Sequence, residues 1–379
     1  MRQPARWART TLMTRLRDLG LAIGRLPTGP TNSIADVDGV SVGHATVVHD
    51  GPRVARTGVT VVHTRPPGRR GMLCPGAMYS LNGNGEFTGS HWLAESGLLA
   101  GPVAITNTHQ VGLVRDELVR WQVERNPATQ WCLPVVGETY DGFLNDIDAF
   151  HLEASHVRAA LADADRPRLP GEPVVVEGCV GGGTGMVCHQ FKGGIGTSSR
   201  RAGEPGSADG EFTVGALVQA NYGRRALLRL DGARIGHLVG DDVVPLPSEP
   251  HVPEAGSVIV LVATDAPLVA DQCRRLAQRA TIGLARVGSI AADSSGDIVL
   301  AWSAGNEVPE DAASAVTVRS LPHDHLTPLF EAVAEAVEEA VWNALVAATT
   351  MVGQRGRTVH AIPHDVLCRA AALVSPSAS

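Results

Sequence analysis

The stretch Ala255-Gly-Ser-Val-Ile-Val-Leu-Val262 joins a loop to a strand, and it decides how the rest of the chain is interpreted. Val258–Val262 is a continuous apolar run rich in β-branched residues, which predicts a buried strand. Residues 241–256 contain four prolines, which exclude a helix or a central strand. The sequence therefore predicts a loop that leads Ser257 into the first position of a core strand. By local composition alone, an interdomain linker before an ordinary strand is the favoured interpretation.

Two helices and another strand are predicted downstream. Asp265 can cap a helix that has Pro267 in its first turn, with apolar positions at Leu268, Leu276 and Ile282. Residues 298–302 read Ile-Val-Leu-Ala-Trp and predict a strand. Thr327-Pro328 begins a long helix that ends before Gly353. Its apolar positions fall on one face: Phe330, Val333, Val337, Val341, Ala344 and Ala348.

Upstream, short apolar runs alternate with turns rich in glycine, proline and aspartate. Residues 40–42, 59–62 and 214–219 predict strands, and residues 147–163 predict a helix. The chain has 42 glycines and 44% hydrophobic residues, which suits a compact, turn-rich protein with a sizeable core.

Composition and charge exclude several classes of protein. The net charge of −7 argues against a general nucleic-acid binder, which carries a basic surface. The six cysteines are dispersed and form no CxxC pair, which favours buried free thiols over a disulfide framework or a zinc ribbon. Lys192 is the only lysine, so it is the single candidate for a Ser–Lys dyad.

Neither end of the chain predicts contact with a membrane. Residues 1–19 carry five arginines without an uninterrupted apolar core, unlike a secretory signal, and we treat them as an N-terminal extension in which Met1 or Met13 is the true start. Near the C-terminus, four glutamates interrupt the longest apolar stretch, which excludes a transmembrane helix; they are Glu331, Glu335, Glu338 and Glu339. We expect a soluble, cytoplasmic protein.

Common catalytic and cofactor motifs are missing from the sequence. It contains no GxSxG elbow, no HExxH pair and no GxxxxGK[ST] phosphate loop. His323-Asp-His325 could bind a metal, but its place before the long helix favours turn and capping contacts. We therefore expect neither a metal nor a cofactor.

Eight motifs follow one another along the chain: Gly24–Asn32, Asp36–His44, Asn82–Glu86, Thr106–Thr108, Gly137–Gly142, Gly194–Arg200, Gln219–Gly223 and Gly256–Pro267. Together they resemble the peptidase family of β-aminopeptidases and L-aminopeptidase/D-Ala-esterase/amidases. The match runs from about Gly20 into the C-terminal third. So many motifs in the right order overrule the linker interpretation of residues 241–256.

The resemblance implies an α/β/β/α sandwich of the N-terminal-nucleophile hydrolase type, related in scaffold to ornithine acetyltransferase. It implies one catalytic domain, residues 20–379, cut between Gly256 and Ser257 into an α chain (1–256) and a β chain (257–379). Such enzymes are homo-oligomers, often tetramers of αβ units. They release N-terminal residues, including β-amino acids in some members, from short peptides, amides and esters.

Cleavage before Ser257 would create the base that a serine nucleophile needs. A free α-amine has an unperturbed pKa of about 7.7–8.0, and here it would be tethered to the hydroxyl that it deprotonates. Gly256 lacks a Cβ, so it tolerates strained backbone angles and lets Ser257 Oγ approach its carbonyl. Cleavage could then proceed through an N→O acyl shift to an ester that water hydrolyses.

The remaining roles come from the resemblance. Asn221 and Tyr140 would donate to the oxyanion, although a turn asparagine and a core tyrosine would look the same. Ser295 and Asp297 resemble a Ser-Gly-acid element that orients the nucleophile and its amine, although a hairpin turn would read identically. Some relatives have glutamate there, and the shorter aspartate leaves the contact distance open. Glu138 would anchor the substrate's ammonium group, unless it forms a structural ion pair.

Two other functions stay open. An acyltransferase like ornithine acetyltransferase shares the self-cleaving scaffold, but such enzymes generally have threonine after the cut, where this chain has Ser257. A non-enzymatic scaffold would never be processed. The sequence does not decide between α- and β-amino acids, L and D residues, or amides and esters.

Overall fold

Strand β13 (Ser257–Thr264) lies inside the larger of the two main sheets, as its apolar run predicts. It pairs antiparallel with β10 (Glu211–Asn221) and parallel with β14 (Gly296–Ser303). The sheet order is β15-β3-β14-β13-β10-β9, with β4 paired to β3. The remaining strands of this sheet are β3 (Met72–Gly83), β4 (Leu98–Leu99), β9 (Gly194–Gly203) and β15 (Val308–Pro309).

The computed structural model describes residues 13–66, 71–126, 131–203, 210–247 and 256–374. Of the proline-rich segment, Pro250, Pro253 and Ala255 lie outside these ranges. The smaller sheet has the order β1-β2-β5-β6. Its strands are β1 (Ser41–His49), β2 (Ala55–His63), β5 (Val103–Asn107) and β6 (Val135–Thr139).

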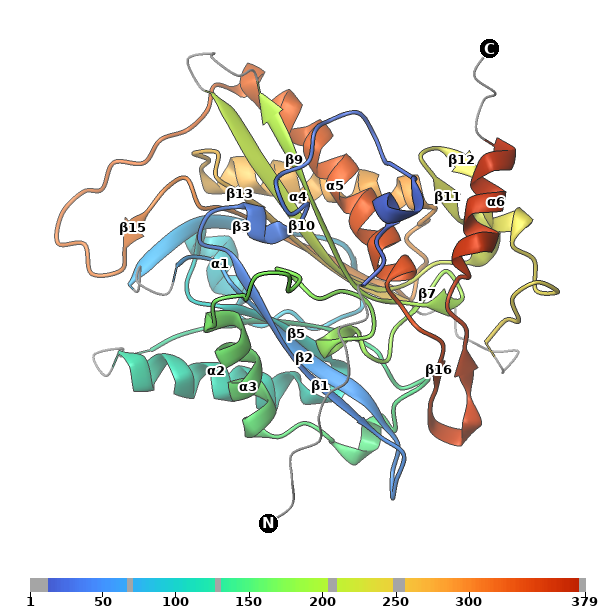
Figure 1. Cartoon of the computed structure of the whole chain (residues 1–379). Coiled ribbons are helices and arrows are strands. Elements are labelled where there is room, and N and C mark those ends of the chain that lie inside the picture. The colour runs from blue at the N-terminus through green and yellow to red at the C-terminus, as the bar shows by residue number, and fades with distance from the viewer. Residues whose placement is uncertain (1–12, 67–70, 127–130, 204–209, 248–255, 375–379) are drawn as a thin grey trace.

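Helices cover the outer face of each sheet (Figure 1). Helices α2 (Val111–Arg125) and α3 (Ala154–Asp165) pack on the smaller sheet, and α4 (Ala270–Val287) and α5 (Thr327–Val346) on the larger. The shorter elements are α1 (Ser90–Ser96), α6 (His364–Val374), β7 (Val187–Cys188), β8 (Phe191–Lys192), β11 (Arg229–Leu230), β12 (Ala233–Arg234), β16 (Met351–Val352) and β17 (Thr358–Val359). In the part of the chain that the structure describes, no helix combines the length and apolarity needed to span a bilayer.

The mixed α/β fold has its layers in the order helices, sheet, sheet, helices. Alternate β13 side chains enter different cores, because successive strand residues point to opposite faces. Val258, Val260 and Val262 pack toward α4 and α5, whereas Ile259 and Leu261 pack toward the smaller sheet. Both faces of β13 are covered, so the strand reads as one uninterrupted apolar run.

Three local predictions are wrong. Helix α4 begins at Ala270 rather than after Asp265, because Asp265 Oδ1 accepts the backbone N–H of Thr213 at 2.8 Å and caps nothing. Ile282 is 49% exposed instead of lying on an apolar face. The predicted helix over 147–163 is two elements, a 3-10 turn (Ile147–Ala149) and α3, separated at Phe150, whose φ is +51°.

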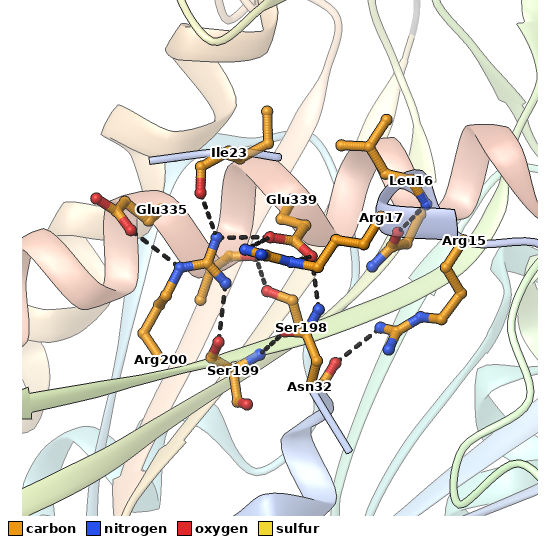
Figure 2. Close-up of polar contacts among 12 residues, drawn as sticks. Arg15, Leu16, Arg17, Ile23, Asn32, Ser198, Ser199, Arg200, Glu335 and Glu339 are labelled. Atoms are coloured by element: carbon orange, nitrogen blue, oxygen red, sulfur yellow. Dashed lines mark hydrogen bonds and ion pairs between the residues drawn. The ribbon is translucent and has the colours of Figure 1, made fainter. Parts of the chain in front are cut away.

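Helix α5 is buried almost all round, so its single predicted apolar face is too narrow. It ends at Val346, which leaves Ala348 beyond it. Glu335 and Glu339 are buried with the apolar residues because Arg200, itself fully buried, pairs with them at 2.9 and 2.6 Å. Figure 2 shows this guanidinium between the two carboxylates. A buried charge is tolerated when it is paired in this way.

The end of the predicted N-terminal extension packs against α5. Leu16 is fully buried, and its N–H donates to Asn343 Oδ1 at 3.0 Å. Arg17 pairs with Glu339 at 2.8 Å, and Arg15 pairs with Glu177 at 2.7 Å (Figure 2 labels both arginines). Residues 13–19 thus contribute to the same core as the rest of the chain, whereas residues 1–12 lie outside the described ranges.

Candidate active site

Ser257 stands at the point where three strands of the larger sheet meet. As the first residue of β13, it faces Asn221, the last residue of β10, and pairs with Gly296, the first residue of β14. The residue is buried, with 5% of its surface exposed. The strand register, and not sequence proximity, brings these positions together.

Two donors reach the hydroxyl of Ser257. The backbone N–H of Tyr140 and the Nδ2 of Asn221 each lie 3.3 Å from Ser257 Oγ. Asn221 is held at both ends of its amide, because Oδ1 accepts Val187 N at 2.8 Å and Nδ2 also donates to Tyr140 O at 3.0 Å. Asn221 is therefore a strand residue rather than a turn asparagine. Tyr140 presents its backbone to Ser257, while its side chain is 48% exposed and is no core tyrosine.

Gly256 has no room for a side chain. A Cβ there would lie 2.8 Å from Tyr222 Cα and 3.0 Å from Asn221 O, closer than side-chain carbons approach backbone atoms. Its backbone is not in the left-handed region, so close packing and not a strained φ explains the glycine. The Gly256 carbonyl accepts the backbone N–H of Gly296 at 3.3 Å.

Ser295 and Asp297 form a pair beside this strand end. Ser295 Oγ donates to Asp297 Oδ1 at 2.7 Å, and Asn82 Nδ2 lies 3.4 Å from Asp297 Oδ2. Burial raises the pKa of Asp297, against the lowering effect of these two hydrogen bonds. Asp297 lies within β14 and pairs across the sheet with Asn82, so it is not part of a hairpin turn. Among the hydrogen bonds between described residues, none joins either residue of the pair to Ser257.

Glu138 is a buried carboxylate at the end of β6 with neutral donors around it. Glu86 N donates to Oε1 at 3.0 Å, and Thr108 Oγ1 donates to Oε2. Burial raises the pKa of Glu138 and outweighs both hydrogen bonds. No arginine, lysine or histidine of the described chain forms an ion pair with Glu138. This environment disfavours the structural ion pair and leaves a buried acid without a cation.

Four of the side chains predicted to belong to the site, and Tyr140, line one cavity of about 740 Å³. Ser257, Asn221, Glu138 and Ser295 line it together with Tyr140, whereas Asp297 lies behind Ser295.

The loop Asn82–Glu86 connects the two sides of the cavity, and sequence reasoning gave it no role. Asn82 Nδ2 donates to Ala292 O at 2.9 Å and Asn84 Nδ2 to Ser294 O at 2.7 Å, while Glu86 N reaches Glu138. The motif and Thr106–Thr108 had been recognised only as parts of the resemblance. Their asparagines, glycines and threonine were the available signal.

The other candidates lie away from the cavity. Lys192 is fully buried and donates to the carbonyls of Met186 and Gly193 at 2.9 and 2.8 Å, so it forms no dyad with Ser257. His323 lies in a 3-10 turn before α5 and contacts Arg275 at 2.8 Å. Within the described ranges, no group of three or more histidine, cysteine or acidic side chains is close enough to hold a metal ion.

The fold and this cavity, compared with known proteins, define the chain as a hydrolase of the aminopeptidase class. Residues 32–359 match the model of peptidase family S58. The chain belongs to that family.

Similar proteins cover nearly the whole chain. It is 42% identical over 370 residues to the beta-peptidyl aminopeptidase BapA of Sphingosinicella microcystinivorans, covering 93% of this chain and 90% of that protein. A solved Burkholderia sp. beta-aminopeptidase aligns with a TM-score of 0.85 and 47% identity over 96% and 99% of the two chains. The L-aminopeptidase D-Ala-esterase/amidase of Ochrobactrum anthropi, described as a prototype of the serine aminopeptidases and a variant of the Ntn hydrolase fold, aligns with a TM-score of 0.84 and 40% identity over 95% and 98%.

Proposed function

We propose that this chain is a self-processing serine aminopeptidase whose nucleophile is Ser257. One observation carries the proposal: a buried serine hydroxyl follows a glycine with no room for a Cβ, lies 3.3 Å from two N–H donors, and faces a cavity that contains an unpaired buried carboxylate. The names of the relatives, which include serine aminopeptidases, support the same reaction.

Maturation begins, in this proposal, when Ser257 Oγ attacks the carbonyl carbon of Gly256. The Oγ–C bond forms, the C–N bond breaks, and the hydroxyl proton passes to the departing nitrogen. Gly296 N, which donates to the Gly256 carbonyl, stabilises the oxygen as it becomes negative. Water then hydrolyses the ester, which leaves a Gly256 carboxylate, a free Ser257 hydroxyl and a new α-amine.

In the substrate reaction the α-amine of Ser257 takes the proton from Oγ as Oγ attacks the substrate carbonyl. Asn221 Nδ2 and Tyr140 N donate to the developing oxyanion, and the proton is returned to the leaving amine. Water repeats the sequence on the acyl-enzyme. Ser295 and Asp297 orient the α-amine from behind, and the contact made by Asp297 passes through Ser295 Oγ.

Glu138 makes the enzyme an exopeptidase in this mechanism, because its carboxylate pairs with the free ammonium of the substrate. The substrates are short peptides, amides and esters that carry an N-terminal L-, D- or β-amino acid. Support for this range comes from the relatives, named for β-peptidyl, L-aminopeptidase and D-Ala-esterase/amidase activities.

We also propose a cytoplasmic homo-oligomer, a tetramer of αβ units. All six cysteines are unpaired in the structure, which suits a reducing compartment. Size-exclusion chromatography with light scattering tests the assembly: a monomeric αβ unit at micromolar concentration would contradict it.

N-terminal sequencing tests the processing step. Purified protein should yield a second chain beginning Ser257-Val-Ile-Val260, and Ser257→Ala should yield only the intact chain, without activity. An intact wild-type chain with full aminopeptidase activity would contradict the proposal. An intact, inactive wild-type chain would favour the non-enzymatic scaffold.

The scaffold relationship to ornithine acetyltransferase is a proposal as well, and it keeps one alternative reaction open. Acetyl transfer from N-acetylornithine separates the two: a processed chain that transfers acetyl groups faster than it hydrolyses aminoacyl p-nitroanilides would be an acyltransferase. The hydroxyl of serine rather than threonine at position 257 favours the hydrolase.

A further inference from the structure

The charges on the wall of the catalytic cavity differ in sign. Of the described residues that line it, Glu138 is the only acid, and Arg224 and Arg357 are the only bases with permanent charge. Glu138 is assigned to the ammonium of the substrate. The two arginines have no part in the mechanism above, so their position relative to Ser257 matters.

One segment of chain carries Glu138 and the turn that contacts Arg357, and Glu138, Ser257 and Arg357 line the same cavity. Tyr140 N contacts Ser257 Oγ, and Glu138 precedes Tyr140 by two residues. After Tyr140 the chain turns, with Leu144 N donating to Asp141 O at 3.1 Å, and brings Phe143 against Arg357. The Arg357 guanidinium lies 5.1 Å from the centre of the Phe143 ring, and its Nη1 donates to Phe143 O at 3.3 Å.

The loop that carries Arg357 is firmly attached to this turn. Gln354 Nε2 donates to Gly142 O at 2.6 Å and to Asn145 O at 2.8 Å, and Gln354 N donates to Leu144 O at 2.7 Å. The strand pair β16–β17 flanks the same loop. The Arg357 backbone is therefore held in a defined place beside the nucleophile.

Arg224 lines the same cavity. It follows Asn221 by three residues, and its carbonyl lies 3.1 Å from His189 Nδ1. The neighbouring Val187 contacts Asn221 through its N–H and packs with Phe143 in one apolar cluster. Among the described residues that line it, the cavity thus holds one acid, Glu138, and two arginines, Arg224 and Arg357, together with the nucleophile Ser257.

We propose that Arg357, with Arg224 beside it, binds the C-terminal carboxylate of a short peptide substrate. This inference rests on the proposed function and narrows it: a di- or tripeptide places its ammonium at Glu138, its first peptide bond at Ser257 and its carboxylate at Arg357. A guanidinium suits this ligand because its planar N–H groups bind carboxylates in pairs.

Three substrates with the same N-terminal residue test the subsite in the mature enzyme: a dipeptide, its C-terminal amide, and the p-nitroanilide. The dipeptide should be preferred over its amide by about tenfold in kcat/KM, the effect of one charge-assisted hydrogen bond. Arg357→Gln should remove this preference and leave kcat/KM for the amide and the anilide within about twofold. Arg355→Gln is the matched control, because Arg355 is exposed, lies in the same loop and does not line the cavity.

Equal kcat/KM for dipeptide and amide in the wild type would overturn the inference. So would an Arg357→Gln variant that loses activity on all three substrates alike, since that result would make Arg357 a support for the Phe143 turn. If none of the three is hydrolysed, the proposed function fails, and calorimetric titration still tests the subsite. A dipeptide that binds no more tightly than its amide, or equally to Arg357→Gln, would then overturn it.

Discussion

Glu339 and Glu138 are both buried glutamates, yet their surroundings are opposite. Glu339 accepts from Arg17 at 2.8 Å and pairs with Arg200 at 2.6 Å, and these arginines, outweighing burial, lower its pKa (Figure 2). Glu138 has two neutral donors and, among the described residues, no ion-pair partner, and burial raises its pKa. The arginines beside Glu339 offset the cost of burying its charge, whereas we propose that Glu138 receives its cation from a ligand.

The largest effect, on the free energy of unfolding, should come from replacing Glu339, the carboxylate that is paired with arginines. Glu339→Gln leaves Arg17 and Arg200 without their shared anion, and losing one partner of a buried pair costs about 3–5 kcal/mol of unfolding free energy. Denaturant melts measure this. Glu331→Gln is the control on the same helix: its partner Arg25 is 80% exposed, so solvent screens the pair and little stability should be lost. Equal losses in the two variants would remove the distinction between buried and surface pairs.

Asn221→Ala should damage turnover more than binding. In the proposed mechanism its amide contacts charge that develops only in the transition state, and losing one such donor costs about 10²–10³ in kcat, roughly 2.7–4 kcal/mol. Self-cleavage should slow as well, so mass spectrometry must first confirm the Ser257 terminus and kcat must be expressed per mature site. If kcat stays within a few fold of wild type while thermal stability falls, Asn221 is structural.

Glu138→Gln should reverse the behaviour of Glu339→Gln. Loss of the ammonium contact should reduce kcat/KM about 10–100-fold, as for hydrogen bonds to charged groups at about 1.5–3 kcal/mol, with little loss of stability. Steady-state kinetics and melts on the same preparation measure both. Glu86→Gln is the matched control, since Glu86 is exposed and reaches the site through its backbone N–H. A loss of stability in Glu138→Gln as large as that in Glu339→Gln would show that Glu138 stabilises the fold.

The contributions of Glu339 and Glu138 to stability should also change with pH in opposite directions. The lowered pKa of Glu339 means that its stabilisation is present above its unfolded pKa, about 4.3, and is lost as pH falls through the folded value. The raised pKa of Glu138 means that the fold favours its neutral form, so stability is lost as pH rises through the folded value. Melts of both Gln variants against wild type from pH 3 to pH 7 test this; parallel curves would contradict it.

The smallest effect should come from metal removal. The proposed mechanism uses no metal, so EDTA should leave kcat/KM unchanged, while a serine-directed acylating agent should abolish activity by labelling the β chain. Activity that EDTA removes and zinc restores would show that the site works differently.

Most of the fold could be predicted from short-range patterns in the sequence, because an apolar run such as Val258–Val262 indicates that its own strand is buried on both faces. Partners far away in sequence could not be predicted. Glu339 looked like an interruption of an apolar stretch, since Arg17 lies 322 positions away from it. Likewise, the contact of Ser257 with Asn221 depends on strand register. The neutral donors around Glu138 come from segments far apart in sequence, so its surroundings depend on tertiary packing.

The most direct test of the account is to label the protein's amines in the native state. Lys192 is the only lysine and is fully buried, so a reagent such as acetic anhydride should report mainly chain termini. We predict that mass spectrometry finds a label on the α-amine of Ser257, in a peptide that starts there, and that activity falls in proportion to this label. Full activity with Ser257 completely labelled, or active protein with no terminus at Ser257, would contradict the account.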